Sequence, residues 1–534
     1  MYDKVYDYII IGSGFGGSVS AMRLSEKGYD CLVLEKGKEY KQNDFPKTNW
    51  NLPKYFWVPL FKWFGFQKLT FFKEVFVISG VGVGGGSLVY ANTHMYPPDT
   101  FFNNKIWSSI KDWKAVLEPF YKTAKFMLGT TENKTFGKAD SVLKELADDY
   151  GKPESFHGVD VGIYFGDTNN EKDPYFNGLG PKRLGCTECA GCMVGCRFNA
   201  KNTLDKNYLY FAKKNGCDVQ AETLVTKIEF INDVYHIHTQ SSTSWFSKNK
   251  TVFKCNGLVV SGGVLGTMDL LLKQKYKYKT LLNLSDTLGE NFRTNSESLC
   301  GITANEKLNH GIAISSVFEP DEHTHIEIVK YPNKSNSMKL FASLATGDGS
   351  MFVRSLKLIG NIITKPHHVY KTWFNGKWAE NSIIFLVMQN LDNSMKMVYK
   401  KFPFGKISIQ NSKDNKVPAY IEPGQKAMHK FAEKVNAVPQ NSIMEVLFNT
   451  SSTAHVLGGC PMGESSKTSV VNDKFEIHGY PKMYVLDGSI IPCNLGVNPS
   501  LTITALSEYA MSHISEKDGN IQKSIEEQMK EICK

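Results

Sequence analysis

The pattern of hydrophobic and polar positions at the start of the chain predicts a strand, a helix and a second strand. The run from Tyr8 to Gly12 is apolar, as expected of a buried parallel strand. Between Ser18 and Lys27 the apolar residues recur at helical spacing, and Gly28 follows where such a helix ends. Cys31 to Glu35 has the pattern of another strand. This order predicts a βαβ unit.

Farther along, the pattern alternates between helical and strand-like segments. We predict a strand at Ser87–Tyr90 and a mixed α/β layer over residues 303–452. Residues 218–262 alternate polar and apolar positions, which is typical of an antiparallel meander that returns into a parallel strand. Within the mixed layer, two runs are strand-like: Thr324–Val329 and Ile383–Met388. The whole pattern indicates an α/β protein.

Glycines stand at the turn between the first strand and the helix, in the pattern Gly12-x-Gly14-x-x-Gly17 with Phe15 inside it. The first glycine permits the turn, the second lets the backbone approach a pyrophosphate, and the third lets the helix pack on the sheet. The helix N-terminus offers free N–H groups to the phosphates. Glu35, at the end of the next strand, can accept hydrogen bonds from ribose hydroxyls and would repel a 2′-phosphate. These features predict a dinucleotide other than NADP.

Two further glycine-containing segments favour FAD over an exchangeable nicotinamide. Gly80 to Gly86 is a second glycine-rich loop, and Leu486-Asp487-Gly488-Ser489 provides a third contact at a strand end. Backbone from three distant parts of the chain suits a large cofactor that lies extended through the protein. We therefore predict bound FAD, with Asp487 among the residues around it.

Several longer blocks are similar to the glucose–methanol–choline (GMC) oxidoreductase family, and within it to the cholesterol oxidase branch. The similarity covers nearly the whole chain. The blocks are the N-terminal glycine pattern, Gly84–Ser87, Ala200–Leu204, Leu288–Glu297, His455–Gly463 and Asp487–Thr504. The resemblance implies cofactor contacts at Gly86, Tyr90, Asn92, Val225, Gly488 and Ser500. It also implies that His455 and Asn498 are the catalytic pair that faces the flavin.

The chemistry of alcohol oxidation gives these residues roles. An O–H proton must leave and a C–H hydride must pass to the flavin. His455 suits a hydrogen-bond partner or general base for the alcohol, because imidazole titrates near neutral pH. Asn498 can form a second contact, either to the alcohol oxygen or to the edge of the flavin. For the carboxylate that moves a proton and shifts the double bond in cholesterol oxidases, we expect Glu327, with Glu297 as the rival.

Four cysteines, Cys186, Cys189, Cys192 and Cys196, have the spacing of a bacterial ferredoxin loop. They predict an iron–sulfur cluster, another metal such as zinc, or free or paired thiols. A cluster would draw electrons from the flavin and make the enzyme a dehydrogenase. An iron–sulfur cluster with these four cysteines as ligands is therefore one expected second cofactor.

Composition narrows the partners and the location. The chain of 534 residues has a net charge of +9, without a compact basic cluster or nucleic-acid motif, so no nucleic acid is expected. We see no signal peptide and no transmembrane run, and expect a cytoplasmic protein. The aromatic segment 55–66 is either core or a lid for a lipid-like alcohol. The basic, amphipathic segment 354–363 is either a solvated face or a peripheral membrane contact.

These observations predict an FAD-binding Rossmann-like fold of the GMC type with an inserted α+β substrate-binding domain. The FAD domain is expected at 1–42, 75–97, 203–302 and 453–534, and the substrate-binding domain with its Cys-rich loop at 43–74, 98–202 and 303–452. The predicted activity is oxidation of a bulky hydrophobic alcohol such as a 3β-hydroxysterol, with O2 or an unidentified compound as electron acceptor. Isomerisation of the product from Δ5 to Δ4 is a further expectation. The alternative is an alcohol or sugar dehydrogenase that passes electrons through an iron–sulfur cluster.

Overall fold

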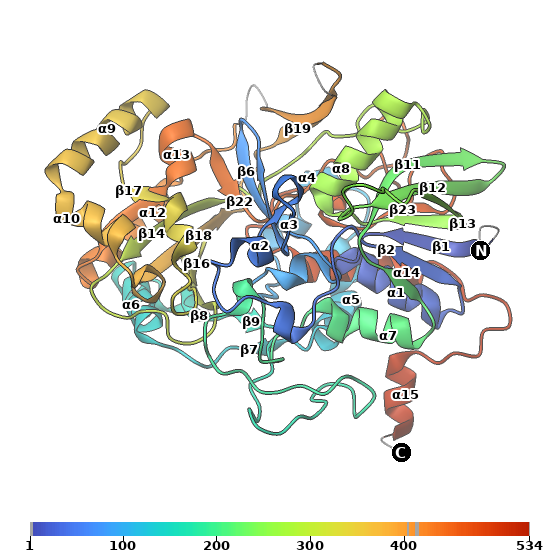
Figure 1. The fold of residues 1–534 in the computed structure, drawn as a ribbon, viewed down its shortest axis with the longest axis horizontal. Helices are drawn as coiled ribbons and strands as arrows, with labels where there is room; N and C mark the ends of the chain where they lie inside the picture. Colours follow the sequence, from blue (N-terminus) through green and yellow to red (C-terminus); the bar gives the residue numbers. More distant parts are fainter. Residues whose placement is uncertain (1–3, 403–404, 412–415, 533–534) are drawn as a thin grey trace.

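Two large β-sheets, each covered by helices, lie side by side in the molecule (Figure 1). The computed structural model describes residues 4–402, 405–411 and 416–532. The first sheet runs in the order β10 (Asp218–Gln220), β2 (Cys31–Leu34), β1 (Val5–Ile11), β13 (Thr251–Val260), β12 (Val234–Ser241) and β11 (Thr223–Ile231). A seventh strand, β23 (Met483–Val485), pairs with the end of β13.

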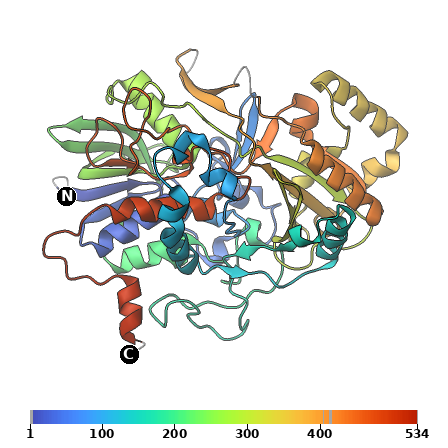
Figure 2. The same cartoon turned by 180° about the vertical axis from the view of Figure 1, so that it is seen from behind.

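The βαβ unit forms as predicted. β1 pairs in parallel with both β2 and β13, and its central residues are buried because helices cover the sheet. Helix α1 (Phe15–Glu26) begins three residues earlier than the apolar spacing indicates. It packs beside α14 (Ser500–Ser512) and α7 (Tyr208–Lys214), as the view from behind shows (Figure 2). The antiparallel meander over 218–262 is also confirmed, as β11, β12 and β13.

One predicted strand is wrong. Ser87–Tyr90 is not extended, because Gly85–Leu88 form a 3-10 turn. The strand lies earlier, as β6 (Val75–Gly80), and the glycine loop follows it directly. Gly82, Gly84 and Gly85 have φ of +137°, +105° and +53°, so the chain turns back on itself where the apolar residues suggested a strand.

The second sheet is antiparallel and forms most of the other half of the molecule. Its order is β17 (Ala342–Leu344), β21 (Val438–Ser442), β14 (Ser298–Thr303), β18 (Ser382–Gln389), β16 (Thr324–Val329), β15 (Ile314–Asp321) and β8 (His157–Gly158). Helices α6 (Lys138–Asp149) and α12 (Glu422–Lys434) bury their apolar faces against it in a separate core. The two strands predicted in the mixed layer are β16 and the centre of β18.

A small third sheet joins the two halves. β22 (Ser451–Thr453) pairs in parallel with β6, and β6 pairs with β5 (Gln67–Phe71). β6 leads into the second glycine loop and β22 leads into His455, so this sheet brings the cofactor loop and the histidine block together.

The remaining elements complete the layers. On the side of the first sheet lie α5 (Trp113–Met127), α8 (Gly263–Lys273) and, at the end of the described chain, α15 (Ile525–Ile532). Beside the second sheet lie α9 (Met351–Thr364), α10 (Pro366–Val369) and α13 (Ile443–Phe448). Shorter elements are α2 (Leu52–Tyr55), β3 (Trp57–Val58), β4 (Trp63–Phe64), α3 (Asp99–Phe102), α4 (Lys105–Ser108), β7 (Thr131–Glu132), β9 (Asp160–Val161), α11 (Trp378–Asn381), β19 (Met395–Lys400) and β20 (Lys406–Asn411).

Over the described ranges, no helix combines the length and the apolar character that crossing a membrane requires.

Candidate active site

The two glycine-rich loops meet at Ser13. The Ser13 hydroxyl donates to Glu35 Oε2 at 2.7 Å, and Gly84 N donates to the Ser13 oxygen at 3.1 Å. The backbones come so close that a Cβ added to Gly85 would lie 2.6 Å from the Cα of Gly14. Loops that are about 70 residues apart in the sequence therefore form one glycine-lined surface beside the N-terminus of α1.

This surface has the features that a bound dinucleotide requires. A Cβ added to Gly14 would meet no protein atom within 4 Å, and one added to Gly86 would meet only Phe15, at 3.6 Å. Asn92 is completely buried, and both its amide oxygen and nitrogen lack a hydrogen-bond partner within the described chain. Open space at the glycines and an unpaired buried amide are what a cofactor pyrophosphate and ring system would fill. The residues present fit FAD.

The other predicted cofactor residues surround the same region. Glu35 is buried, and it also accepts from Gly37 N at 2.8 Å, while Thr223 N at the start of β11 donates to its backbone oxygen, which brings Val225 near. The Tyr90 ring lies edge-on to Phe15 at 5.5 Å.

The side chains of two predicted cofactor residues near the C-terminus, Asp487 and Ser500, form hydrogen bonds within the protein. The Asp487 carboxylate accepts from Ser489 N and from Thr267 Oγ1, and so fixes the turn that begins at Gly488. Ser500 starts α14, and its hydroxyl donates to Thr93 O at 2.8 Å. The side chains of Asp487 and Ser500 therefore shape the loops on which they lie.

His455 is held by a buried carboxylate. Its Nδ1 lies 2.8 Å from Glu297 Oε2, and Glu297 also accepts from Thr453 Oγ1 at 2.9 Å and from Ala454 N at 3.1 Å. His455 Nε2 forms no hydrogen bond with any described residue. One ring nitrogen is fixed, and the other remains for a ligand.

The electrostatics favour the protonated imidazole. Burial lowers the pKa of His455, but the charge and hydrogen bond of Glu297, together with the charge of Glu327, outweigh it and raise that pKa above the ordinary value. The ring is therefore able both to hold a proton and to stabilise negative charge that develops on a nearby oxygen.

A second carboxylate faces the predicted catalytic asparagine. Asn498 Nδ2 donates to Glu327 Oε2 at 3.2 Å, and Glu327 is fully buried on β16. Asn498 Oδ1 is buried and lacks a partner within the described residues. The structure thus brings His455, Asn498 and both candidate carboxylates together, and it gives the carboxylates different neighbours: Glu297 contacts the histidine and Glu327 the asparagine.

Some residues of this centre were missed from the sequence. Asn295 accepts from Leu495 N and Gly496 N, both at 2.9 Å, and so holds the loop that presents Asn498. His325 lies 3.3 Å from Glu327 Oε1. The only signal for His325 was its position two residues before Glu327, because alternate residues of a strand project to the same face.

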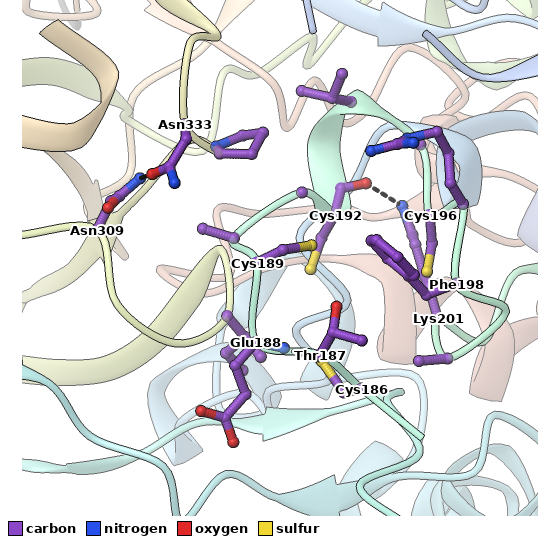
Figure 3. A pocket seen from close by; sticks show the side chains of 18 of the residues that line it. Cys186, Thr187, Glu188, Cys189, Cys192, Cys196, Phe198, Lys201, Asn309 and Asn333 are labelled. Atoms are coloured by element: carbon purple, nitrogen blue, oxygen red, sulfur yellow. Dashed lines mark hydrogen bonds between the residues drawn. The ribbon is translucent and has the colours of Figure 1, made fainter. Parts of the chain in front are cut away.

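The predicted metal site finds no support in the described residues. All four cysteines lie in one loop and line one pocket (Figure 3), but no group of three or more His, Cys, Asp or Glu side chains in the described chain is arranged to hold a metal ion. The buried ammonium of Lys201 instead holds this loop, by donating to the backbone oxygens of Leu88, Tyr90 and Cys192.

Three of the four thiols lie in different electrostatic environments. Burial raises the pKa of the Cys186 and Cys192 thiols, which disfavours thiolates. For Cys196 burial acts in the same direction, but Lys206 and backbone N–H groups outweigh it and lower the pKa. The iron–sulfur cluster therefore has no support from the arrangement of the described residues.

The aromatic segment 55–66, which the sequence assigned either to the core or to a lid, has both buried and exposed parts. Tyr55 and Phe66 are buried in a small core and Trp57 is also buried, whereas Leu60 and Phe61 are mostly exposed at the turn between β3 and β4. The two ends of the segment therefore contribute to the core, and its middle, residues 59–62, is exposed.

Comparisons with known proteins agree with this architecture. The GMC oxidoreductase profile matches residues 402–507, and an NAD(P)-binding Rossmann-like profile matches residues 10–40. A cholesterol oxidase of Acinetobacter baumannii is 42% identical over 529 residues, with 96% of this chain and 95% of that protein covered. A cholesterol oxidase of Mycobacterium tuberculosis (strain CDC 1551 / Oshkosh) is 40% identical over 528 residues, with 95% and 90% covered.

A solved structure shares the fold. Pyridoxine 4-oxidase from Mesorbium loti superposes with a TM-score of 0.60 at 13% identity, over 95% of this chain and 99% of that one. With the sequence relatives, this confirms a Rossmann-like FAD-binding sheet joined to a separate antiparallel sheet. The chain belongs to the GMC oxidoreductase family and is an FAD-dependent enzyme, similar to cholesterol oxidases, that acts on CH–OH donors.

Proposed function

We propose that this enzyme oxidises the 3β-hydroxyl group of a sterol with O2 as acceptor, and that it moves the double bond of a Δ5 product to Δ4. One observation carries the proposal: Asn498 Oδ1 is buried without a partner in the described chain while Asn498 Nδ2 donates to buried Glu327, and Glu297 holds His455 by Nδ1, which leaves Nε2 without a hydrogen bond to the described residues. The names of the two relatives support the sterol and the acceptor. The alternative dehydrogenase depended on the iron–sulfur cluster and loses its basis.

In this proposal each side chain has one task. The neutral form of His455 takes the hydroxyl proton of the alcohol on Nε2, Asn498 binds the alcohol oxygen, Glu297 orients the imidazole, and Glu327 takes a proton from C4 and returns it to C6. When bound, FAD supplies the hydride acceptor. No redox change accompanies the isomerisation, since one C–H bond breaks and another forms.

We also propose the residues that hold the cofactor and the division into domains. The phosphates would lie at Gly12, Gly14, Phe15, Gly17 and Gly86, the ribose at Glu35, the adenine at Val225, and the flavin near Tyr90, Asn92, Asp487, Gly488 and Ser500. The domains would keep the boundaries predicted from the sequence, with one change. The predicted boundary at 302/303 falls within β14, which pairs with strands of the second sheet, so we place this boundary before Ser298.

Glu327→Gln tests the function, because glutamine keeps the size and hydrogen-bonding reach of glutamate but cannot carry the proton. With a Δ5-3β-hydroxysterol, the variant should form the unconjugated Δ5-3-ketone and hydrogen peroxide. The wild type should form the conjugated Δ4-3-ketone, which is distinguished by its ultraviolet absorbance and by chromatography. Glu297→Gln is the matched control, since it removes a buried carboxylate that contacts His455 and should slow oxidation without accumulation of the Δ5-ketone.

Conjugated product at the wild-type rate from Glu327→Gln would transfer the proton step to another residue. A wild-type enzyme that consumes no O2 with any 3β-hydroxysterol would refute the substrate.

We further propose that α9 places the enzyme on an anionic lipid surface, where a sterol would be found. Large apolar side chains cover the outer face of α9 and the turn after it, and they are exposed: Met351, Phe352, Val353, Leu356, Ile359, Ile362, Ile363, Tyr370 and Phe374. Figures 1 and 2 show α9 and α10 at the end of the molecule remote from the first sheet. Monomeric proteins rarely expose so large an apolar patch without a partner.

The charges around this face select the partner. Residues 349–379 contain no Asp or Glu, and Lys357, Lys365, Lys371 and Lys377 form no salt bridge within the described chain. The inner face is fixed by Arg354, which donates to Glu445 Oε1 at 2.6 Å, and by buried Leu358. A rigidly held amphipathic helix with exposed apolar residues and lysines that form no salt bridge suits anionic headgroups.

Vesicle sedimentation tests this surface. Wild-type enzyme should bind vesicles of phosphatidylcholine with phosphatidylserine more tightly than phosphatidylcholine alone, and Ile363→Glu should reduce binding about tenfold, since it places a charge in the apolar layer. Leu282→Glu, at an exposed leucine outside this face, is the control. Equal binding by Ile363→Glu and wild type would refute the proposal, as would a wild-type dimer that Ile363→Glu dissociates.

A further inference from the structure

A chain of hydrogen bonds leads from buried Glu327 to the surface. His325 Nε2 lies 3.3 Å from Glu327 Oε1, and His325 Nδ1 lies 3.1 Å from Glu319 Oε1. Along this chain the exposed fraction of the side chain rises from 0% at Glu327 to 5% at His325 and 49% at Glu319. One imidazole therefore bridges a carboxylate that solvent cannot reach and one that it can.

The fold explains why the three groups line up. His325 and Glu327 are two residues apart on β16 and project to the same face of the sheet. Glu319 is on the neighbouring strand β15, where the register with β16 shifts between Phe318 and Asp321. The regular register Val317↔Glu327 and Phe318↔Ile326 continues to Glu319 opposite His325, and the shift follows at the hairpin end.

The outer end of this chain opens into a cavity. Glu319 and His325 line a cavity of about 460 Å³, together with His157, His323, Asn390 and Val497. Val497 adjoins Asn498, so the cavity and the catalytic centre share a wall. Water in the cavity can reach Glu319 but not Glu327.

We propose that His325 and Glu319 form a proton path that connects Glu327 with solvent in this cavity. The path rests on the proposed role of Glu327 as the carrier of the C4 proton. A proton passes from His325 Nε2 to Glu327, and Nδ1 takes another from Glu319, which water reprotonates; the reverse order unloads Glu327. Each transfer moves one proton between hydrogen-bonded atoms, and no electron changes place.

Local charges support a proton-loaded imidazole. Burial lowers the pKa of His325, but the hydrogen bonds and charges of Glu319 and Glu327 raise it to about 9. His157 on β8 and Lys152 also face Glu319, and with His325 they lower the pKa of that carboxylate. Near neutral pH the ring therefore carries protons on both nitrogens, as a two-sided donor requires.

Solvent deuterium tests the path. Without it, the proton that Glu327 takes from C4 returns to C6, and product formed in D2O carries no new deuterium there. With the path, Glu327 exchanges its proton and the wild-type product gains deuterium at C6, which mass spectrometry measures. His325→Gln should lower that fraction about tenfold or more, because a positioned acid–base group typically accelerates proton transfer ~10²–10⁴-fold. His323→Gln, in the same cavity but bonded to Asn390 rather than Glu327, is the matched control.

A merely structural role for His325 predicts another result. His325→Lys keeps a positive charge between the carboxylates but offers one nitrogen instead of two, so it should fold and still lose deuterium incorporation. Wild-type product without deuterium, or unchanged incorporation in folded His325→Gln or His325→Lys, would overturn the path. A wild type that forms only the Δ5-ketone would instead refute the role of Glu327, and the path with it, which distinguishes the two failures.

Discussion

The catalytic centre and the cysteine loop contain the densest clusters of reactive side chains that the sequence singled out, and they are built differently. Glu297, Glu327, His455 and Asn498 come from four segments spread over about 200 residues, yet hydrogen bonds or charge link each to another of the set. The four cysteines come from eleven consecutive residues, yet their thiols do not form a ligand set.

The difference shows what spacing can and cannot establish. Residues that are distant in the sequence meet only where the fold brings them together, so a buried group left without a partner there, such as Asn498 Oδ1, indicates a ligand. Residues within one short loop are close in any fold, and closeness alone gives no common orientation. Beside the cysteine loop, the buried polar group is the Lys201 side chain, and its Nζ donates to three backbone oxygens, so it has no need of a ligand.

The largest effect is expected at the cofactor surface that adjoins the centre. Gly14→Val should leave a folded protein without visible flavin absorbance, because the protein itself leaves space for a Cβ at Gly14 and only the pyrophosphate would be displaced. Gly17→Val is the contrast, since its Cβ would lie 2.0 Å from Gly12 O and should impair folding. Full flavin content in Gly14→Val would remove Gly14 from the proposed site.

Next in size is the loss of the imidazole. His455→Ala should keep FAD and lower turnover ~10²–10⁴-fold, the usual cost of removing one positioned acid–base group. Steady-state kinetics with a flavin spectrum of the same preparation checks both points. Turnover close to the wild type would mean that the free nitrogen of His455 does not meet the substrate.

Removing the partner of the histidine should have a smaller effect and a distinct pH signature. Glu297→Gln should lower turnover about 10- to 100-fold, as seen where a carboxylate orients a functional histidine. Without the Glu297 charge, the burial that lowers the pKa of His455 is less opposed, so the limb of the pH–rate profile that belongs to His455 should move to lower pH. A limb that stays in place would separate Glu297 from the titration of His455.

The smallest effects are expected in the cysteine loop. Cys189→Ser, at the exposed cysteine, should change the free energy of unfolding by no more than about 0.5 kcal/mol and leave turnover unchanged. Denaturant titration and metal analysis of the purified protein check this. Iron or zinc in stoichiometric amount, lost in Cys189→Ser, would restore the loop as a metal site and weaken the comparison.

Much of the fold could be predicted from the pattern of the chain. The βαβ unit, the meander and β16 formed as expected because buried strands need apolar residues and helices need a 3.6-residue period. Ser87–Tyr90 was misjudged because positive φ at consecutive glycines turns the chain, and that backbone choice outweighs the strand propensity of Leu88 and Val89.

The sequence by itself determined the family, the glycine pattern around the cofactor and the types of side chain available for the chemistry, because these depend on local spacing and residue type. Only the tertiary structure decided which carboxylate contacts His455, which contacts Asn498, that His325 joins Glu327 to Glu319, and that the cysteines remain separate thiols. The physical reason is that hydrogen bonds and pKa shifts depend on distances of a few ångströms between side chains, whether these are 158 and 171 residues apart, as for the two carboxylates, or lie within one hairpin or loop. Those distances are fixed by how the two sheets pack, which no local pattern specifies.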